Sequence, residues 1–208
     1  MILEKLIYDT FETKGEQNKA VVVIHGWKGN KDSFKSIASL LKLSNTTWFF
    51  PEAPFNFEQD TSKKTWTYQK DDGSWEVEKP KALLDDFFQS VVFGKFQPNE
   101  VYVMGFSQGA TVCYEFVLGL KHRFAGVFPI AGFLRDPKGE LVIHPEQCNT
   151  PILIGHGRQD NIVPFKASEI AFEKINKICH NVRLHPYNGK HKIGVEYLRE
   201  VKKLIELD

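Results

Sequence analysis

A serine stands between two glycines in the segment GFSQG, which closes an apolar run of the chain. Residues 101–104 are typical of a buried strand, and residues 109–120 of the helix that follows it. A serine on so tight a turn has strained backbone angles, and Gly105 and Gly109 leave room where side chains would collide. The segment therefore predicts that the hydroxyl of Ser107 stands clear of the sheet, beside a helix N-terminus, as a nucleophile.

A serine alcohol reacts only when a base takes its proton, and that base needs an orienting acid. On a parallel sheet of this kind the expected chain order is Ser, then Asp or Glu, then His. Asp160 follows the strand-like run 151–154, and His191 follows the run 182–186. We therefore predict that Ser107, Asp160 and His191 meet at the edge formed by the carboxyl ends of the strands.

Other acids and bases stay open at this stage. Asp136, in the loop after a predicted strand, is the alternative acid, and Asp160 itself could instead cap a helix or a loop. His144 and His156 are loop candidates for the base that lack a partner pattern. His185 lies inside a predicted strand and is interpreted as structural.

Attack on an acyl carbonyl also needs hydrogen-bond donors for the developing oxyanion. One predicted donor is the backbone N–H of Gln108, the residue after the serine. The second is the N–H of Trp27, in the loop HGWKG that follows the first buried run. We expect His25, at the start of that loop, to brace it rather than to take part in the chemistry.

The elements that position these loops alternate along the chain. Apolar runs predict strands at residues 21–25, 47–50, 101–104, 126–130, 151–154 and 182–186, with one or two edge strands in the first 13 residues. Helical spacing predicts helices around residues 34–41, 84–92, 109–120, 167–179 and 194–207. This order indicates an α/β fold: a single domain over residues 1–208, with a mostly parallel sheet and helices on both faces.

Residues 54–80 interrupt this alternation, because they are polar and yet rich in aromatic side chains. Asp72 and Gly73 within them form a hairpin-turn signal. A segment this long inside a compact domain is usually functional or disordered, so we interpret it as a lid-like or pocket-lining insertion. Candidates for the walls of an apolar pocket, with core or lid packing as an equal alternative, are Phe55, Phe57, Trp66, Trp75 and Phe133.

The composition argues against several other classes of protein. A net charge of +1 gives no reason to expect nucleic acid or an anionic membrane as partner. No apolar run approaches the ~20 residues that cross a bilayer, and Glu4 and Lys5 interrupt the N-terminus, so neither membrane insertion nor a signal peptide is expected. Cys113, Cys148 and Cys179 lack metal-type spacing and favour a reduced, cytoplasmic protein. We expect no metal or other cofactor, and the sequence does not indicate an oligomeric state.

Taken in order, these motifs resemble those of the α/β-hydrolase superfamily, and within it the phospholipase/carboxylesterase group that includes acyl-protein thioesterases. The matching segments, spread over about residues 20–205, are HGWKGN, PEAP, GFSQGA, GHGRQDNIVP and NGKHKIG. The resemblance implies that Ser107, Asp160 and His191 form a triad, and that Trp27 and Gln108 supply the oxyanion donors. We expect a serine carboxylesterase that hydrolyses small to medium acyl esters through an acyl-enzyme. The alternatives are acyl-protein thioesterase or lysophospholipase activity, or a non-catalytic ligand-binding protein on the same scaffold.

Overall fold

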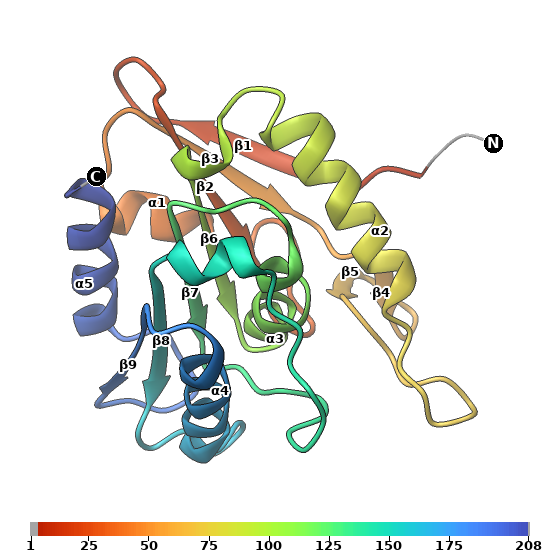
Figure 1. Cartoon of the computed structure of the whole chain (residues 1–208). Coiled ribbons are helices and arrows are strands. Elements are labelled where there is room, and N and C mark those ends of the chain that lie inside the picture. Colours follow the sequence, from red (N-terminus) through yellow and green to blue (C-terminus); the bar gives the residue numbers. More distant parts are fainter. Residues whose placement is uncertain (1–3, 208) are drawn as a thin grey trace.

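The buried apolar runs form a seven-stranded sheet in the computed structural model, which describes residues 4–207 (Figure 1). β1 at one edge runs antiparallel to β3, and all the other neighbours in the sheet are parallel. The mostly parallel sheet is therefore confirmed, as is an edge strand within the first 13 residues, of which residues 1–3 lie outside the described part. In spatial order the strands are β1 (Tyr8–Glu12), β3 (Thr46–Pro51), β2 (Lys19–Ile24), β6 (Val101–Phe106), β7 (Gly126–Ile130), β8 (Ile152–Gly157) and β9 (Val182–Tyr187).

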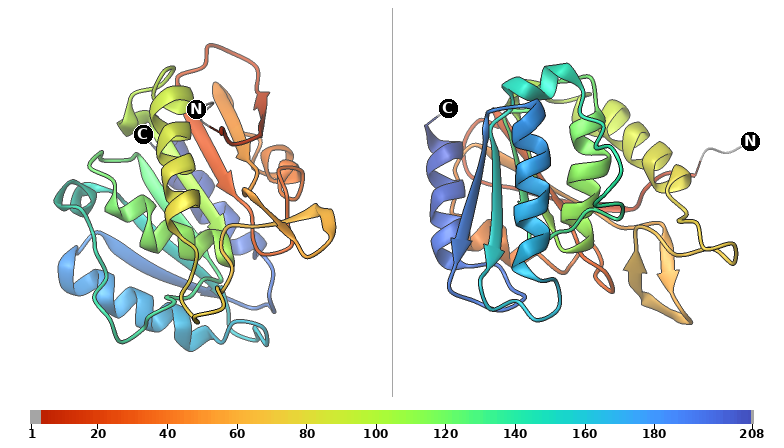
Figure 2. Two further views of the ribbon diagram at one scale, coloured as in Figure 1. Left: turned by 90° about the vertical axis from the view of Figure 1, so that its right-hand side faces the viewer. Right: turned by 60° about the horizontal axis from the view of Figure 1, so that its bottom comes forward.

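Helices cover both faces of this sheet, which explains why its central strands are apolar on both sides (Figure 2). On one face lie α2 (Glu78–Phe87), α3 (Gln108–Glu115) and α4 (Phe165–Ile178). On the other face lie α1 (Lys35–Leu41) and α5 (Val195–Glu206). Within the described residues every helix is too short or too polar to cross a bilayer.

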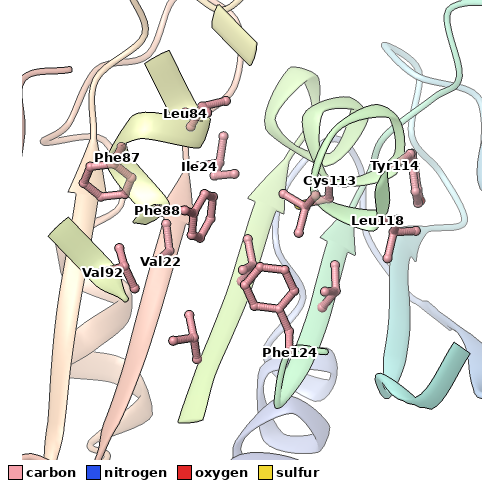
Figure 3. Close-up of a cluster of buried hydrophobic side chains, with 14 of the residues drawn as sticks. Val22, Ile24, Leu84, Phe87, Phe88, Val92, Cys113, Tyr114, Leu118 and Phe124 are labelled. Carbon is pink, nitrogen blue, oxygen red and sulfur yellow. The ribbon is translucent and has the colours of Figure 1, made fainter. Parts of the chain in front are cut away.

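The core under α2 and α3 is dominated by large side chains (Figure 3). Phe88 and Phe124 are completely buried, and they lie among aliphatic residues that include Val22 and Ile24 of β2. Burying a side chain of this kind contributes roughly 1.5–3 kcal/mol. This packing fixes the carboxyl ends of β2 and β6, and both of these ends lead directly into the candidate site.

The ends of two predicted helices differ from the sequence pattern. The helix expected at 84–92 begins earlier, at Glu78, and its last turn widens into a π-helical turn, η1 (Phe88–Val92). The helix expected at 109–120 ends at Glu115, followed by the 3₁₀ turn η3 (Val117–Gly119). Further 3₁₀ turns are η2 (Pro98–Glu100) and η4 (Pro145–Asn149).

Residues 54–80 contain a second, two-stranded sheet that the sequence did not indicate. Its strands are β4 (Phe55–Phe57) and β5 (Asp60–Thr65), and they lie apart from the main sheet (Figure 2). The predicted turn does form, because Gly73 has a φ of +82° and its N–H donates to the carbonyl of Lys70 over 2.9 Å. Pairing across that turn is limited to one bridge, between Gln69 and Trp75.

Two of the three cysteines form a disulfide, so the prediction that all are reduced is wrong for Cys148 and Cys179. The pair joins η4 to the end of α4, 31 residues further along the chain. Linear spacing gave no sign of this pairing, because only the fold brings these two ends together. Cys113 is a free, buried thiol on α3, so the prediction of a reduced cysteine holds for this residue.

Candidate active site

Ser107 occupies a strained turn between β6 and α3, as the motif predicts. Its φ of +54° and ψ of −116° lie in a region that residues with side chains rarely adopt. A Cβ on Gly105 would lie 2.3 Å from the carbonyl oxygen of Gly109, and one on Gly109 would lie 2.1 Å from that of Ile24. Only glycine fits at either position, so the two glycines flanking the serine are explained by close contact of the backbone.

The structure brings the three residues of the predicted triad together. Nε2 of His191 lies 3.1 Å from Oγ of Ser107, and Nδ1 of the same ring lies 2.7 Å from Oδ2 of Asp160. Both distances are those of hydrogen bonds. The three side chains come from loops after β6, β8 and β9, so parallel strands explain how residues 84 and 31 positions apart meet at one edge.

The carboxylate of Asp160 is buried and strongly hydrogen-bonded. Its Oδ1 accepts hydrogen bonds from the backbone N–H groups of Ile162, at 2.9 Å, and Val163, at 3.0 Å. Burial alone raises the pKa of Asp160, but the hydrogen bonds from His191 and these two N–H groups lower it, and the net pKa is below its ordinary value. Asp160 is therefore ionised at neutral pH, as an acid that orients a histidine needs to be.

The other acid and base candidates have different partners. Asp136 accepts hydrogen bonds from Lys138 and Gly139 in its own loop. His144 caps η4 through a hydrogen bond from the N–H of Glu146. His185, the strand residue, packs edge-on against a tyrosine of α5. None of the three has a contact with Ser107 or His191 among the described residues.

The HGWKG loop lies directly beside the nucleophile turn. A Cβ on Gly26 would lie 3.3 Å from Cβ of Ser107, which places Gly26, the residue before Trp27, next to the serine. His25 braces this loop, because its Nδ1 lies 2.8 Å from the carbonyl of Gly26 and its Nε2 accepts the N–H of Ala53 over 3.0 Å. Burial lowers the pKa of His25 to about 4, so the ring is neutral and suited to this bracing.

Both predicted oxyanion donors are free to bind a substrate oxygen. Within residues 4–207 the N–H of Trp27 has no acceptor. Gln108 is the first residue of α3, where a helix leaves its N–H groups unpaired. Trp27, Gln108 and Ser107 line the same cavity.

The side chain of Gln108 forms a clasp that the sequence did not reveal. Its Oε1 accepts the N–H of Trp66 over 2.9 Å, and its Nε2 donates to the hydroxyl of Thr65 over 2.9 Å. We call these three residues the Gln108 clasp. It ties the insertion 54–80 to the residue after the nucleophile, over more than 40 positions of sequence.

A cavity of about 560 Å³ opens beside Ser107, and most of the surface that lines it is apolar. Of the predicted wall residues, Phe57, Trp75 and Phe133 line it. Phe55 instead packs on Tyr68, with ring centroids 4.9 Å apart, and Trp66 is buried with its indole N–H donated to the carbonyl of His25. Lining residues that sequence reasoning missed include Tyr68, Ile162 and Val163. Within the described residues no group of three or more His, Cys, Asp or Glu side chains could hold a metal ion.

The fold is that of the α/β hydrolases. The crystal structure of esterase PE8 superposes with a TM-score of 0.84, at 21% identity, and the match covers 98% of this chain and 99% of that one. Residues 8–208 match the Phospholipase/Carboxylesterase family, and the chain therefore belongs to this family. The resemblance inferred from the motifs is thus confirmed.

Some relatives of this chain are acyl-protein thioesterases, and others are carboxylesterases. Acyl-protein thioesterase 1 of Kluyveromyces lactis is 26% identical over 204 residues, which cover 90% of this chain and 88% of the relative. The carboxylesterase SOBER1 of Arabidopsis thaliana is 25% identical over 203 residues, which cover 89% of each chain. The similarity therefore spans nearly the whole chain in both cases.

Proposed function

We propose that the protein is a serine carboxylesterase that hydrolyses small to medium acyl esters through an acyl-enzyme on Ser107. The observation that carries this proposal is the continuous hydrogen-bonded chain from the hydroxyl of Ser107 through His191 to Asp160. The position of Ser107 on a strained turn, beside two free N–H groups and an apolar cavity, supports the same function. Membership of the Phospholipase/Carboxylesterase family agrees with it.

In the proposed mechanism His191 takes the proton of Ser107 as its Oγ attacks the ester carbonyl carbon. Asp160 holds the imidazole in the required tautomer and stabilises the imidazolium. The N–H groups of Trp27 and Gln108 donate to the oxyanion, an interaction typically worth several kcal/mol. His191 then protonates the leaving alcohol, and a water molecule activated by the same ring releases the acid. These steps use side chains and backbone of this chain alone.

The cavity suggests how the acyl group is bound. Its volume of about 560 Å³ and its aromatic lining suit an apolar acyl chain of modest length. Residues 54–80 supply Phe57, Tyr68 and Trp75 to this lining, so we propose that the segment is a pocket-lining insertion with a lid-like position.

A second candidate is hydrolysis of thioesters or lysophospholipids by the same serine, and the names of the relatives favour thioesters. Matched series of oxygen and sulfur esters, extended by two carbons at a time, separate the bond preference from the chain-length preference. A higher kcat/KM for every thioester of the series would replace carboxylesterase by thioesterase as the principal activity.

Replacement of the nucleophile is the first test of the proposal. Ser107→Ala is expected to abolish hydrolysis of p-nitrophenyl acyl esters, with unchanged circular dichroism and unfolding temperature. Full activity in this variant would end the assignment. Labelling of the wild type by a fluorophosphonate with no measurable turnover of any ester would favour a ligand-binding protein instead.

The partners and location follow from less direct observations. We propose a small-molecule ester as substrate and no nucleic acid as partner, given the net charge of +1. A cytoplasmic location stays the prediction from the sequence, but the Cys148–Cys179 disulfide weighs against it, because disulfides are rare in reducing compartments. The compartment can be determined by alkylating free thiols in fresh cell lysate and counting the modified cysteines by mass spectrometry. Three modified cysteines indicate a reducing compartment, and one indicates an oxidising compartment.

A further inference from the structure

A second histidine contacts the carboxylate of the candidate triad. His156 lies near the end of β8 and is completely buried. Its Nε2 lies 2.9 Å from the carbonyl oxygen of Val163 and 3.2 Å from Oδ2 of Asp160. Its Nδ1 lies 2.6 Å from the hydroxyl of Ser168 on α4. Both ring nitrogens therefore have partners, drawn from two loop residues and one helix.

These partners determine where the proton of His156 resides. The carbonyl of Val163 can only accept, so Nε2 carries the proton and donates it. Burial lowers the pKa of His156 below its ordinary value, although the Val163 carbonyl and the charge of Asp160 act in the opposite sense. The ring is therefore neutral, and Nδ1 accepts the hydroxyl proton of Ser168. The Nε2–H group faces both Val163 and Asp160.

The contact completes the set of donors around one carboxylate. Oδ1 of Asp160 accepts the N–H groups of Ile162 and Val163, while Oδ2 faces Nδ1 of His191 at 2.7 Å and Nε2 of His156 at 3.2 Å. Val163 is held at both ends, since its N–H binds Asp160 and its carbonyl binds His156. His156 thus connects the loop of the acid back to the strand from which it emerges.

We propose that His156 is a positioning residue for the triad: it shares its Nε2 proton between Val163 and Asp160 and so holds Oδ2 of Asp160 against His191. The inference rests on the proposed function, because it assigns a role in the same site. His156 touches no substrate in this arrangement, and it acts only through Asp160. A purely structural histidine would support the loop without affecting the protonation of His191.

His156→Phe keeps a buried ring and removes the donor. We expect kcat to fall about tenfold, the size of one lost hydrogen bond to a charged group. Asp160 keeps its two backbone donors but loses the donor of His156. Its negative charge then interacts more strongly with His191, and this favours the imidazolium of His191. The ascending limb of kcat/KM therefore moves to higher pH. His156→Gln, whose amide N–H can reach the place of Nε2, is expected to restore most of the rate and the original limb.

His185→Phe is the matched control, since it removes an imidazole from the neighbouring strand, which pairs with β8 but lies away from Asp160. It should leave kcat and the pH profile unchanged. A folded His156→Phe variant with the rate and pH profile of the wild type would overturn the inference.

A measurement on the wild type tests the premise of this role even where these variants do not fold. Nitrogen NMR of protein labelled at histidine is expected to show His156 neutral, with its proton on Nε2, across the pH range of the ascending limb of kcat/KM. A proton on Nδ1, or titration in that range, would contradict the role. These outcomes are separate from failure of the proposed function, which would show as a wild type that neither turns over esters nor reacts with fluorophosphonate at Ser107.

Discussion

The two sides of the candidate active site are built in different ways. On one side, Ser107, Asp160 and His191 follow strands of the main sheet. The hydrogen bonds between these strands and the buried core therefore fix their positions. On the other side, residues 54–80 form their own small sheet, which lies apart from the main one. The burial of Trp66 in the core and a small number of polar contacts hold this segment in place.

Those contacts connect the insertion to the parts that would bind the oxyanion. The Gln108 clasp holds Thr65 and Trp66. One residue earlier, Lys64 pairs with the HGWKG loop: its carbonyl accepts the N–H of Lys28 over 3.0 Å, and its N–H donates to Gly29 over 2.8 Å. The comparison suggests a division of labour. In the proposed function, the sheet edge would set the chemistry, and the insertion would set which acyl groups fit and how firmly the loop of Trp27 is held.

The largest expected effect comes from the sheet edge. Asp160→Asn should lower kcat about 10⁴-fold, because an amide favours the wrong tautomer of His191. Steady-state kinetics at neutral pH measures this, with circular dichroism to check the fold. Asp136→Asn is the matched control and should have no effect, since the hydrogen bonds of Asp136 come from Lys138 and Gly139 of its own loop. Loss of less than tenfold in Asp160→Asn would mean that the acid lies elsewhere.

A smaller effect is expected from the Gln108 clasp. Gln108→Met keeps the backbone N–H and the length of the side chain, but leaves the buried N–H of Trp66 unpaired. We expect kcat/KM to fall about tenfold, since an unsatisfied buried donor costs roughly 1–3 kcal/mol. Gln108→Glu retains an acceptor for Trp66 and should fall between the wild type and the Met variant. Equal kcat/KM in the Met variant and the wild type would show that the insertion holds its place without the clasp.

The smallest effect is expected at the cavity wall. Trp75→Ala should leave the rate on an acetyl ester unchanged. It should reduce the increase in kcat/KM for each added methylene, an increase that corresponds to at most about 0.8 kcal/mol of binding free energy. A chain-length series of p-nitrophenyl esters measures this slope. Phe55→Ala is the control, because Phe55 belongs to the same insertion but does not line the cavity. Identical slopes in all three proteins would remove Trp75 from acyl binding.

The sheet side of the site could be predicted because its signals are local. An apolar run, two glycines and a serine define the turn within a few residues, and parallel strands then imply that Asp160 and His191 lie at the same edge. The insertion could not be predicted in this way. The place of Trp66 depends on a hydrogen bond to Gln108, 42 positions away, and an aromatic side chain is equally suited to a core and to a cavity wall. The same limit hid the Cys148–Cys179 pair and the contact of His156 with Asp160.

The most direct measurement of the central claim is to locate the acyl group that the protein carries during turnover. The experiment uses a p-nitrophenyl ester whose acyl group leaves the enzyme slowly. Rapid acid quench followed by peptide mass spectrometry should find one acyl group on Ser107. Asp160→Asn should accumulate it far more slowly, and Ser107→Ala should carry none. An acyl group on another residue, or hydrolysis at the full rate with no acylated peptide, would contradict an activated serine at the edge of the sheet.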